Sequence, residues 1–168
     1  MTELRVTVAP LDEADLAGYA LKIAAPLQSA PDSGGPGWEC WFPLGRLPDL
    51  PAQQIGCVRC QPLRTVTVME MHPRRSEVVF AIDRPVIQVL ALPSVDKNAP
   101  EAATARALFL KPGEALQVLP GVWHGVGLAY DAAPTLYWFI LAQASAADQR
   151  EEVGWSAFAN GETLKLAV

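Results

Sequence analysis

From Ile55 onward the chain is a succession of short apolar runs rich in β-branched residues, and this feature restricts the fold more than any other. Eight such runs follow one another, separated by Pro, Gly, Asp or Asn: IGCVRCQP, RTVTVMEMH, EVVFAI, PVIQVLAL, ARALFL, ALQVLP, HGVGLAY and PTLYWFILAQ. Short strands divided by turn residues at regular spacing are typical of a sandwich or a barrel. The sequence therefore predicts an all-β fold.

Two segments outside these runs predict helix. In residues 11–23, LDEADLAGYALKI, Asp12 is a suitable N-cap, and apolar residues recur at helical spacing at Leu16, Tyr19, Ala20 and Ile23. The tail AADQREEVGW, residues 146–155, predicts a short C-terminal helical segment. Residues 29–37 have the composition of a mobile loop. A chain of 168 residues without an internal repeat is expected to form one domain over residues 1–168.

Charge and composition argue against several classes of partner. The net charge of −5 leaves no basic surface for nucleic acid or an anionic membrane. No apolar run approaches the roughly 20 residues of a membrane-spanning helix. The first residues lack the pattern of a signal peptide, and three cysteines are an odd number. We therefore expect a reduced, cytoplasmic protein, with Cys57 and Cys60 as buried apolar residues and not as half of a zinc site.

The run RTVTVMEMH places titratable residues in an expected strand. Residues two apart share a face of a strand, so Glu70 and His72 are expected to point the same way as Val66 and Val68. Glu77 begins the next run. Buried charges persist only when they are paired or bound to a metal ion.

The chain has two histidines, His72 and His124. His124 follows the Pro120–Gly121 turn by three residues, in PGEALQVLPGVWHGVGL. Both histidines therefore lie beside turns within the β-rich part of the sequence.

These two stretches resemble the two motifs of the cupin superfamily. Glu70 stands where many cupins have their first histidine, and His72 and Glu77 match the second histidine and the glutamate. GEALQVLPGVWH resembles the second motif and ends on His124. The resemblance implies a metal site built from Glu70, His72, Glu77 and His124, a set that suits nickel, manganese, iron or zinc. The alternative is a hydrogen-bonded Glu–His group in a barrel without metal.

A narrower resemblance is to the ureidoglycolate lyase family of cupin-fold enzymes. It is carried by VRCQP, MEMHPRRSEVVFAI and PGEALQVLPGVWHGVGLAY, and by the opening segment APLDEADLAGYALKI. The chain differs from the family pattern at Glu77, where the family has Gln, and at Gly125 and Val126, where it has His and Pro. The resemblance implies a cupin-like double-stranded β-helix barrel, a homodimer, and release of urea and glyoxylate from ureidoglycolate in allantoin and purine degradation.

The resemblance also implies roles for individual residues. Glu70, His72 and His124 are the expected catalytic residues, with Glu70 either a metal ligand or the general base. Arg59 either binds the carboxylate of a small substrate or is a surface arginine. Trp123 either lines the pocket or packs in the core. Solvated charges near turns are expected for Arg64, Arg74, Arg75 and Lys111.

Two other functions stay open from the sequence. One is a metal-dependent cupin that acts on a different small carboxylic acid, such as a dioxygenase or an isomerase. The other is a cupin that binds a small molecule without turning it over. No organic cofactor is expected in any of the three cases.

Overall fold

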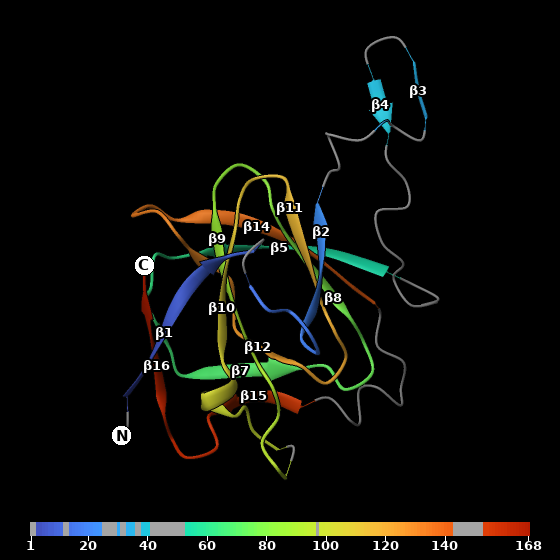
Figure 1. Ribbon diagram of the computed structural model, residues 1–168. Coiled ribbons are helices and arrows are strands. Elements are labelled where there is room, and N and C mark those ends of the chain that lie inside the picture. The colour runs from blue at the N-terminus through green and yellow to red at the C-terminus, as the bar shows by residue number, and fades with distance from the viewer. Residues whose placement is uncertain are drawn as a thin grey trace.

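The computed structural model describes residues 3–11, 14–24, 30, 33–35, 38–40, 53–96, 98–142 and 153–168 (Figure 1). Their regular secondary structure is almost entirely β, which confirms the expected all-β class. The strands are β1 Glu3–Pro10, β2 Ala20–Ala24, β3 Ser33–Gly35, β4 Trp38–Cys40, β5 Gln53–Cys60, β6 Thr65–Val66, β7 Val68–Met71, β8 Glu77–Ala81, β9 Val86–Ala91, β10 Arg106–Leu110, β11 Glu114–Val118, β12 Trp123–His124, β13 Leu128–Ala129, β14 Thr135–Ala142, β15 Val153–Ala157 and β16 Thr163–Ala167. One short 3₁₀ helix, Ala102–Thr104, lies between β9 and β10. Among the described residues, no helix has the length and apolar character needed to span a bilayer.

The strands form two main sheets. The larger sheet has the order β15-β7-β12-β9-β10-β1-β16-β6, with β13 beside β9, and the smaller has the order β2-β11-β8-β14-β5. Strand β6 lies at one end of this order, and β7 is the second strand from the other end. Only one residue separates the two strands in the sequence, so the large sheet curls back on itself. Figure 1 shows β1 and β16 side by side near both chain ends, and β1 runs parallel to β16 and β10.

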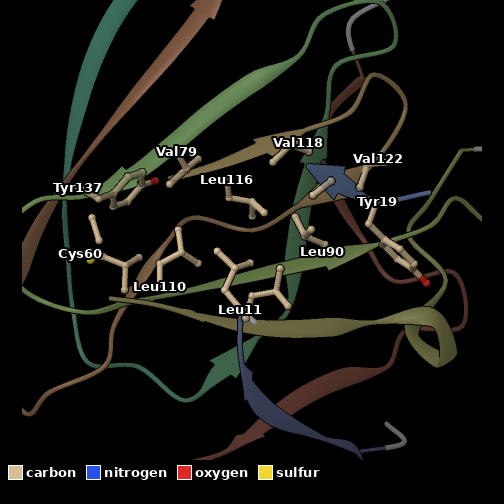
Figure 2. Close-up of a cluster of buried hydrophobic side chains, with 14 of the residues drawn as sticks. Leu11, Tyr19, Cys60, Val79, Leu90, Leu110, Leu116, Val118, Val122 and Tyr137 are labelled. Carbon is tan, nitrogen blue, oxygen red and sulfur yellow. The ribbon is translucent and has the colours of Figure 1, made fainter. Parts of the chain in front are cut away.

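One apolar core joins the two sheets. Its buried side chains come mainly from β8, β9, β10, β11 and β14. Figure 2 shows Tyr137 and Cys60 at one end of this core and Tyr19 at the other, with Leu90 and Leu116 between them. Each fully buried leucine of this kind contributes about 1.5–3 kcal/mol through removal of apolar surface from water.

A second core lies on the opposite face of the central strand β9. Val86 and Leu90 point into the first core, whereas Ile87 and Val89 point into the second. The second core also contains Trp123, together with side chains from β7 and β16. A strand covered on both faces needs an apolar residue at nearly every position, which explains the continuous run PVIQVLAL.

The predicted N-terminal helix is wrong. Residues 14–16 are irregular, residues 17–19 form a turn, and β2 pairs antiparallel with β11, from Ala20 opposite Val118 to Ala24 opposite Glu114. This pairing satisfies the backbone groups of β11 along an edge that would otherwise be open, and it buries Tyr19 and Ala20 in the first core. Those gains outweigh a helical preference that amounts to tenths of a kcal/mol per residue. Asp12 lies outside the described residues.

The predicted C-terminal helical tail is wrong where the structure describes it. Residues 146–152 lie outside the described part, and Val153–Ala157 is strand β15, paired with β7. Within the predicted loop at 29–37, residues Ser33–Gly35 form strand β3 and pair with β4. No observation tests the expected single domain over 1–168, and it stays a prediction.

Candidate metal centre

Four titratable side chains from three strands and their flanks meet in one cluster. β7 carries Glu70 and is followed by His72, β8 begins at Glu77, and β12 ends at His124. One ligand atom from each of the four lies within 4.8 Å of the others. The structure therefore brings together the four residues that the sequence motifs single out.

Alternation along β7 explains how this face becomes polar. Met69 and Met71 point into the second core, so Glu70 and His72 point to the other side of the sheet. β12 lies beside β7 with His124 opposite Glu70, which places their side chains on one face. The expectation that Val66 shares this face is wrong, because Thr67 interrupts the strand and Val66 packs in the second core.

Glu77 is the centre of the cluster. Its Oε2 lies 3.4 Å from Nε2 of His72 and 3.4 Å from Nε2 of His124. Nε2 of His124 is also 3.9 Å from Oε1 of Glu70. The two imidazole rings are 5.3 Å apart between centroids. One buried carboxylate is thus shared by two imidazoles, and the second carboxylate faces the same Nε2 of His124.

The electrostatics favour ionised carboxylate at this site. Burial would raise the pKa of Glu77, but the hydrogen bonds and charges of His124 and His72 outweigh it and lower the pKa to about 2. Burial would likewise lower the pKa of His124, and the hydrogen bond and charge of Glu77, with the charge of Glu70, raise it instead. At neutral pH Glu77 is therefore a carboxylate available as a ligand.

The donor set fits a divalent transition-metal ion. Nε2 of His124 is buried and faces both carboxylates, 3.4 Å from Oε2 of Glu77 and 3.9 Å from Oε1 of Glu70. Its Nδ1 lies 3.3 Å from the carbonyl oxygen of Val122, which accepts a hydrogen bond from Nδ1–H in the tautomer whose Nε2 carries no proton and can bind a metal ion. Two nitrogen and two carboxylate ligands suit nickel, manganese, iron or zinc. Glu70, with 31 % of its side chain exposed, lies on the side of the cluster that opens to solvent.

Arg75 is buried, although the sequence predicts a solvated charge at this position. Only 6 % of the residue is exposed, and its Nη2 lies 3.4 Å from Nδ1 of His72. Arg75 lies in the connection between β7 and β8, where no periodicity indicates burial. Arg64 is also less solvated than expected, since its guanidinium donates to the carbonyl oxygens of Ala129 and Tyr130.

The structure does not bring Arg59 to the cluster. Glu77 pairs with Leu141, and Leu141 pairs with Gln54 on β5. Arg59 lies five residues farther along β5, roughly 16 Å away at the rise of a strand. Its exposed side chain lines a separate surface hollow of about 300 Å³ together with Asp83 and Arg84.

Trp123 packs in the core and does not line the site. It is fully buried, and it pairs with Met71 and Ala91 on the face opposite His124. Of the two places expected for Trp123, the structure shows the core and not the pocket wall. Cys60 is a buried free thiol whose pKa is raised by burial, as expected of an apolar cysteine, and the side chain of Cys57 lies outside the described part of the chain.

Gly125 and Gln88 fix the segment that follows His124. The N–H of Gly125 donates to the carbonyl oxygen of Val89, and Nε2 of Gln88 donates to the carbonyl oxygen of Gly125 at 2.6 Å. A Cβ at position 125 would meet Cγ1 of Val66 at 3.6 Å, an ordinary contact on the side of the second core. The departure from the family pattern at Gly125 thus leaves the four-residue cluster unaltered.

Comparison with known proteins identifies a family. The family model described as ureidoglycolate lyase matches residues 48–159, about two thirds of the chain. No curated protein matches the chain.

Several solved structures are distantly similar. An oxalate oxidase in complex with the substrate analogue glycolate is 15 % identical, with a TM-score of 0.43. The match covers 63 % of this chain and only 46 % of the oxalate oxidase chain. RmlC from Streptococcus suis, in complex with dTDP-D-xylose, is 10 % identical with a TM-score of 0.47, covering 88 % of this chain and 87 % of that one. The RmlC epimerase of Mycobacterium tuberculosis is 15 % identical with a TM-score of 0.41, covering 60 % and 50 %. Similarity at this level carries no argument about substrate.

Proposed function

Because the chain belongs to the ureidoglycolate lyase family, we propose that it releases urea and glyoxylate from ureidoglycolate. The observation that supports this most is the cluster of Glu70, His72, Glu77 and His124, in which one ligand atom from each lies within 4.8 Å of the others. The family match and a built site for a metal ion thus fall on the same residues.

The reaction is the collapse of a carbinolamide. The hydroxyl group of ureidoglycolate loses its proton, the bond between carbon and the urea nitrogen breaks, and the nitrogen gains a proton as it leaves. The products are glyoxylate and urea, and no net proton is consumed. One general base that later donates its proton is sufficient for both transfers.

The chain offers distinct residues for binding and for proton transfer. Glu77, His72 and His124 would hold the metal ion. All three are buried, and the carboxylate of Glu77 faces Nε2 of both histidines. When bound, a divalent ion supplies Lewis-acid stabilisation of the substrate oxygens and lowers the pKa of the hydroxyl group. Glu70 faces the solvent-open side and is suited to take the hydroxyl proton and return it to the nitrogen. Glu77 is a poor base, because its pKa is lowered to about 2.

The wider setting follows from this proposal. Ureidoglycolate arises from allantoin in purine degradation, so a role in nitrogen recovery in the cytoplasm is the corresponding expectation. A homodimer is also expected. Light scattering would give a mass of twice the 18.1 kDa of the chain, and a mass of 18.1 kDa would refute the dimer.

The direct test is an assay for both products. Purified protein is freed of metal, reloaded with nickel or manganese, and supplied with ureidoglycolate. We expect glyoxylate and urea in equal amounts, with a rate that depends on the added ion and is lost in Glu70→Gln. Absence of both products with every ion tried would refute the proposed reaction.

A second candidate is a metal-dependent enzyme for another small carboxylic acid. Glu77 favours it, because an ionised ligand replaces the neutral Gln of the family pattern and changes the charge of the site. Uptake of oxygen by the iron-loaded protein, when a small hydroxy acid is supplied as substrate, would point to this function. Thermal stabilisation by such acids without any turnover would instead indicate a binding protein.

A further inference from the structure

A hollow of about 480 Å³ opens on the large sheet, where β1 separates from β10. β1 pairs with β10 from Val8 to Pro10, and its earlier residues Glu3–Thr7 pair with β16 on the other side. Sites for small molecules usually measure about 300–1,000 Å³. The hollow therefore has room for a small organic molecule.

The hollow is separate from the candidate metal centre. None of the four cluster residues lines it. In the sheet, β9 lies between β10 and β12, the strand that ends at His124. A ligand in the hollow would thus occupy a second site, which has no part in the chemistry described so far.

Two arginines line the hollow from one face of the sheet. Residues two apart in a strand share a face, so Arg5 lies on the face of Ala9, and Arg106 lies on the face of Leu108. Ala9 and Leu108 are paired neighbours, which places both arginines on the same side of the sheet. Both line the hollow and both are exposed.

Positive charge is in excess at this hollow. Asp15 is the third charged residue of the lining, and its Oδ1 accepts a hydrogen bond from the N–H of Ala17. Within the described part of the chain, neither Arg5 nor Arg106 forms an ion pair. Two guanidinium groups, which stay ionised, are thus set against one carboxylate. One anionic group on a ligand would balance the excess.

Arg106 is held in position before any ligand binds. Its Nη1 donates to the carbonyl oxygens of Thr104 at 3.3 Å and Ala105 at 3.0 Å. Its Cζ lies 5.6 Å from the centre of the Tyr19 ring, a cation–π distance. Among the described residues its Nε and Nη2 have no hydrogen-bond partner, so these N–H groups are available to a ligand. A group fixed in advance loses little conformational entropy on binding.

The lining favours a carboxylate on an apolar body. A guanidinium presents parallel N–H groups that match the two oxygens of a carboxylate. Six of the thirteen lining residues are alanines, and Leu4, Val6 and Leu108 are also apolar. Thr7 supplies the single hydroxyl group of this lining. A ligand with many hydroxyl groups would therefore leave most of them without a side-chain partner, at a cost in free energy.

We infer that this hollow binds a small apolar carboxylate, whose carboxylate group lies on Arg5 and Arg106 and whose body packs against the alanines. The inference goes beyond the proposed reaction and does not depend on it. Benzoate has this chemistry and is the probe. Benzamide, of nearly the same shape, is its uncharged counterpart.

The test separates the charge of the site from its space. Arg5→Gln removes one exposed guanidinium, and Ala103→Phe fills the hollow from an exposed position while both charges stay. Arg59→Gln is the matched control, because Arg59 is an exposed strand arginine that lines a different hollow. Ligand-observed NMR titrations give the Kd of benzoate and of benzamide. Circular dichroism establishes that each variant is folded.

We expect Arg5→Gln to raise the Kd of benzoate about 10-fold or more, the usual loss when a hydrogen bond to a charged group is removed. Ala103→Phe should abolish binding, Arg59→Gln should match the wild type, and benzamide should bind the wild type at least about 10-fold more weakly than benzoate. Equal Kd values for the two probes, or undiminished benzoate binding in Arg5→Gln or Ala103→Phe, would overturn the inference. So would a wild type that does not bind benzoate, or a loss of binding in Arg59→Gln.

Titrations of the metal-free and the nickel-loaded wild type distinguish the hollow from the metal centre. Benzoate should bind both forms with the same Kd, because no residue of the lining is a candidate metal ligand. Binding that requires nickel would place the carboxylate on the metal ion and would contradict the inference. Neither result bears on the proposed reaction, which the release of glyoxylate tests separately.

Discussion

At the scale of single residues, Glu77 and Glu70 differ in ways that suit different tasks. Glu77 is buried and lies 3.4 Å from each of two imidazole nitrogens. Glu70 is nearer to solvent, and its Oε1 lies 3.9 Å from Nε2 of His124. Two carboxylates in unlike surroundings can serve as a fixed ligand and as a proton carrier in one site.

Replacing each carboxylate by its amide should separate these tasks. Glu77→Gln is expected to lower nickel affinity by about 100-fold or more, since it removes a charged ligand. Glu70→Gln should reduce glyoxylate release by about 100-fold, the usual contribution of a general base, with nickel affinity nearly retained. Titration calorimetry and the product assay measure the two quantities. Glu3→Gln, which changes an exposed carboxylate on the surface, is the control. Equal effects of Glu77→Gln and Glu70→Gln on nickel affinity would contradict the division of roles.

The lowered pKa of Glu77 predicts how the metal-free protein responds to acid. Its pKa is about 2 when folded, below the ordinary 4.5, so ionised Glu77 stabilises the fold above pH 4.5. That contribution, at most about 3 kcal/mol, is lost as the pH falls from 4.5 to 2. The raised pKa of His124 acts in the opposite sense, because its contribution is present below 6.5 and is lost as the pH rises through the raised value.

Denaturant unfolding of chelator-treated protein measures this effect. The difference in free energy of unfolding between the wild type and Glu77→Gln should be largest near pH 5 to 6 and should shrink as the pH falls toward 2. A difference that is constant over this range would show that Glu77 does not ionise in the way its surroundings require.

The site residues were predictable from the sequence to different degrees. Glu70, His72, Glu77 and His124 follow from motif spacing, and the strand register brings them together. Trp123 was left between pocket and core, although neighbours in a strand point to opposite faces and His124 occupies the face of the site. Arg75 was misjudged because a turn has no periodicity from which burial can be read.

At the scale of elements, the turn between β11 and β12 positions the short strand that ends at His124. Gly121 has φ of +80°, a conformation that favours glycine. Its N–H donates to the carbonyl oxygen of His72 at 2.9 Å. A single turn thus connects the segment before His124 to the other histidine of the cluster.

Gly121→Ala should therefore destabilise the protein. A left-handed conformation costs a residue with a side chain about 1–2 kcal/mol, and no atom lies within 4 Å of the added Cβ to add a clash. Gly154→Ala is the matched control, because that exposed glycine also has open space around it but has no positive φ. Denaturant unfolding compares the two variants, and equal stabilities would argue against strain at Gly121.

The strands were predictable where the helices were not. All eight apolar runs contain described strands, because alternation and turn residues determine them locally. The helix predicted over residues 11–23 is wrong because the helical spacing extends over too short a stretch, at Leu16, Tyr19, Ala20 and Ile23. The unpaired edge of β11, which determines the outcome, is formed by residues about 90 positions later and leaves no trace in the local pattern.

At the scale of the whole molecule, the cluster lies where the two sheets meet. Glu70 and His124 belong to the large sheet, and Glu77 belongs to the small one. A bound ion would therefore join the sheets in addition to their shared apolar core. Any ligand that binds the folded state alone raises the melting temperature, by an amount that grows with the logarithm of its concentration divided by its Kd.

Removal of metal should accordingly lower the melting temperature. We expect a chelator to lower the Tm of the nickel-loaded wild type by several degrees. An ion present at 100 times its Kd or somewhat more stabilises the folded state by about 3 kcal/mol, and the chelator removes this contribution. Readdition of nickel should restore it. The same treatment should leave Glu77→Gln unchanged, and a chelator effect of equal size in that variant would place the ion elsewhere.

The most direct test of the account is the stoichiometry of nickel binding, measured by calorimetric titration of the metal-free protein together with elemental analysis. We predict one ion per chain in the wild type and loss of that binding in His124→Ala, with circular dichroism showing that the variant remains folded. Failure of the wild type to bind nickel, manganese, iron or zinc, or undiminished binding in folded His124→Ala, would contradict a metal centre at Glu70, His72, Glu77 and His124.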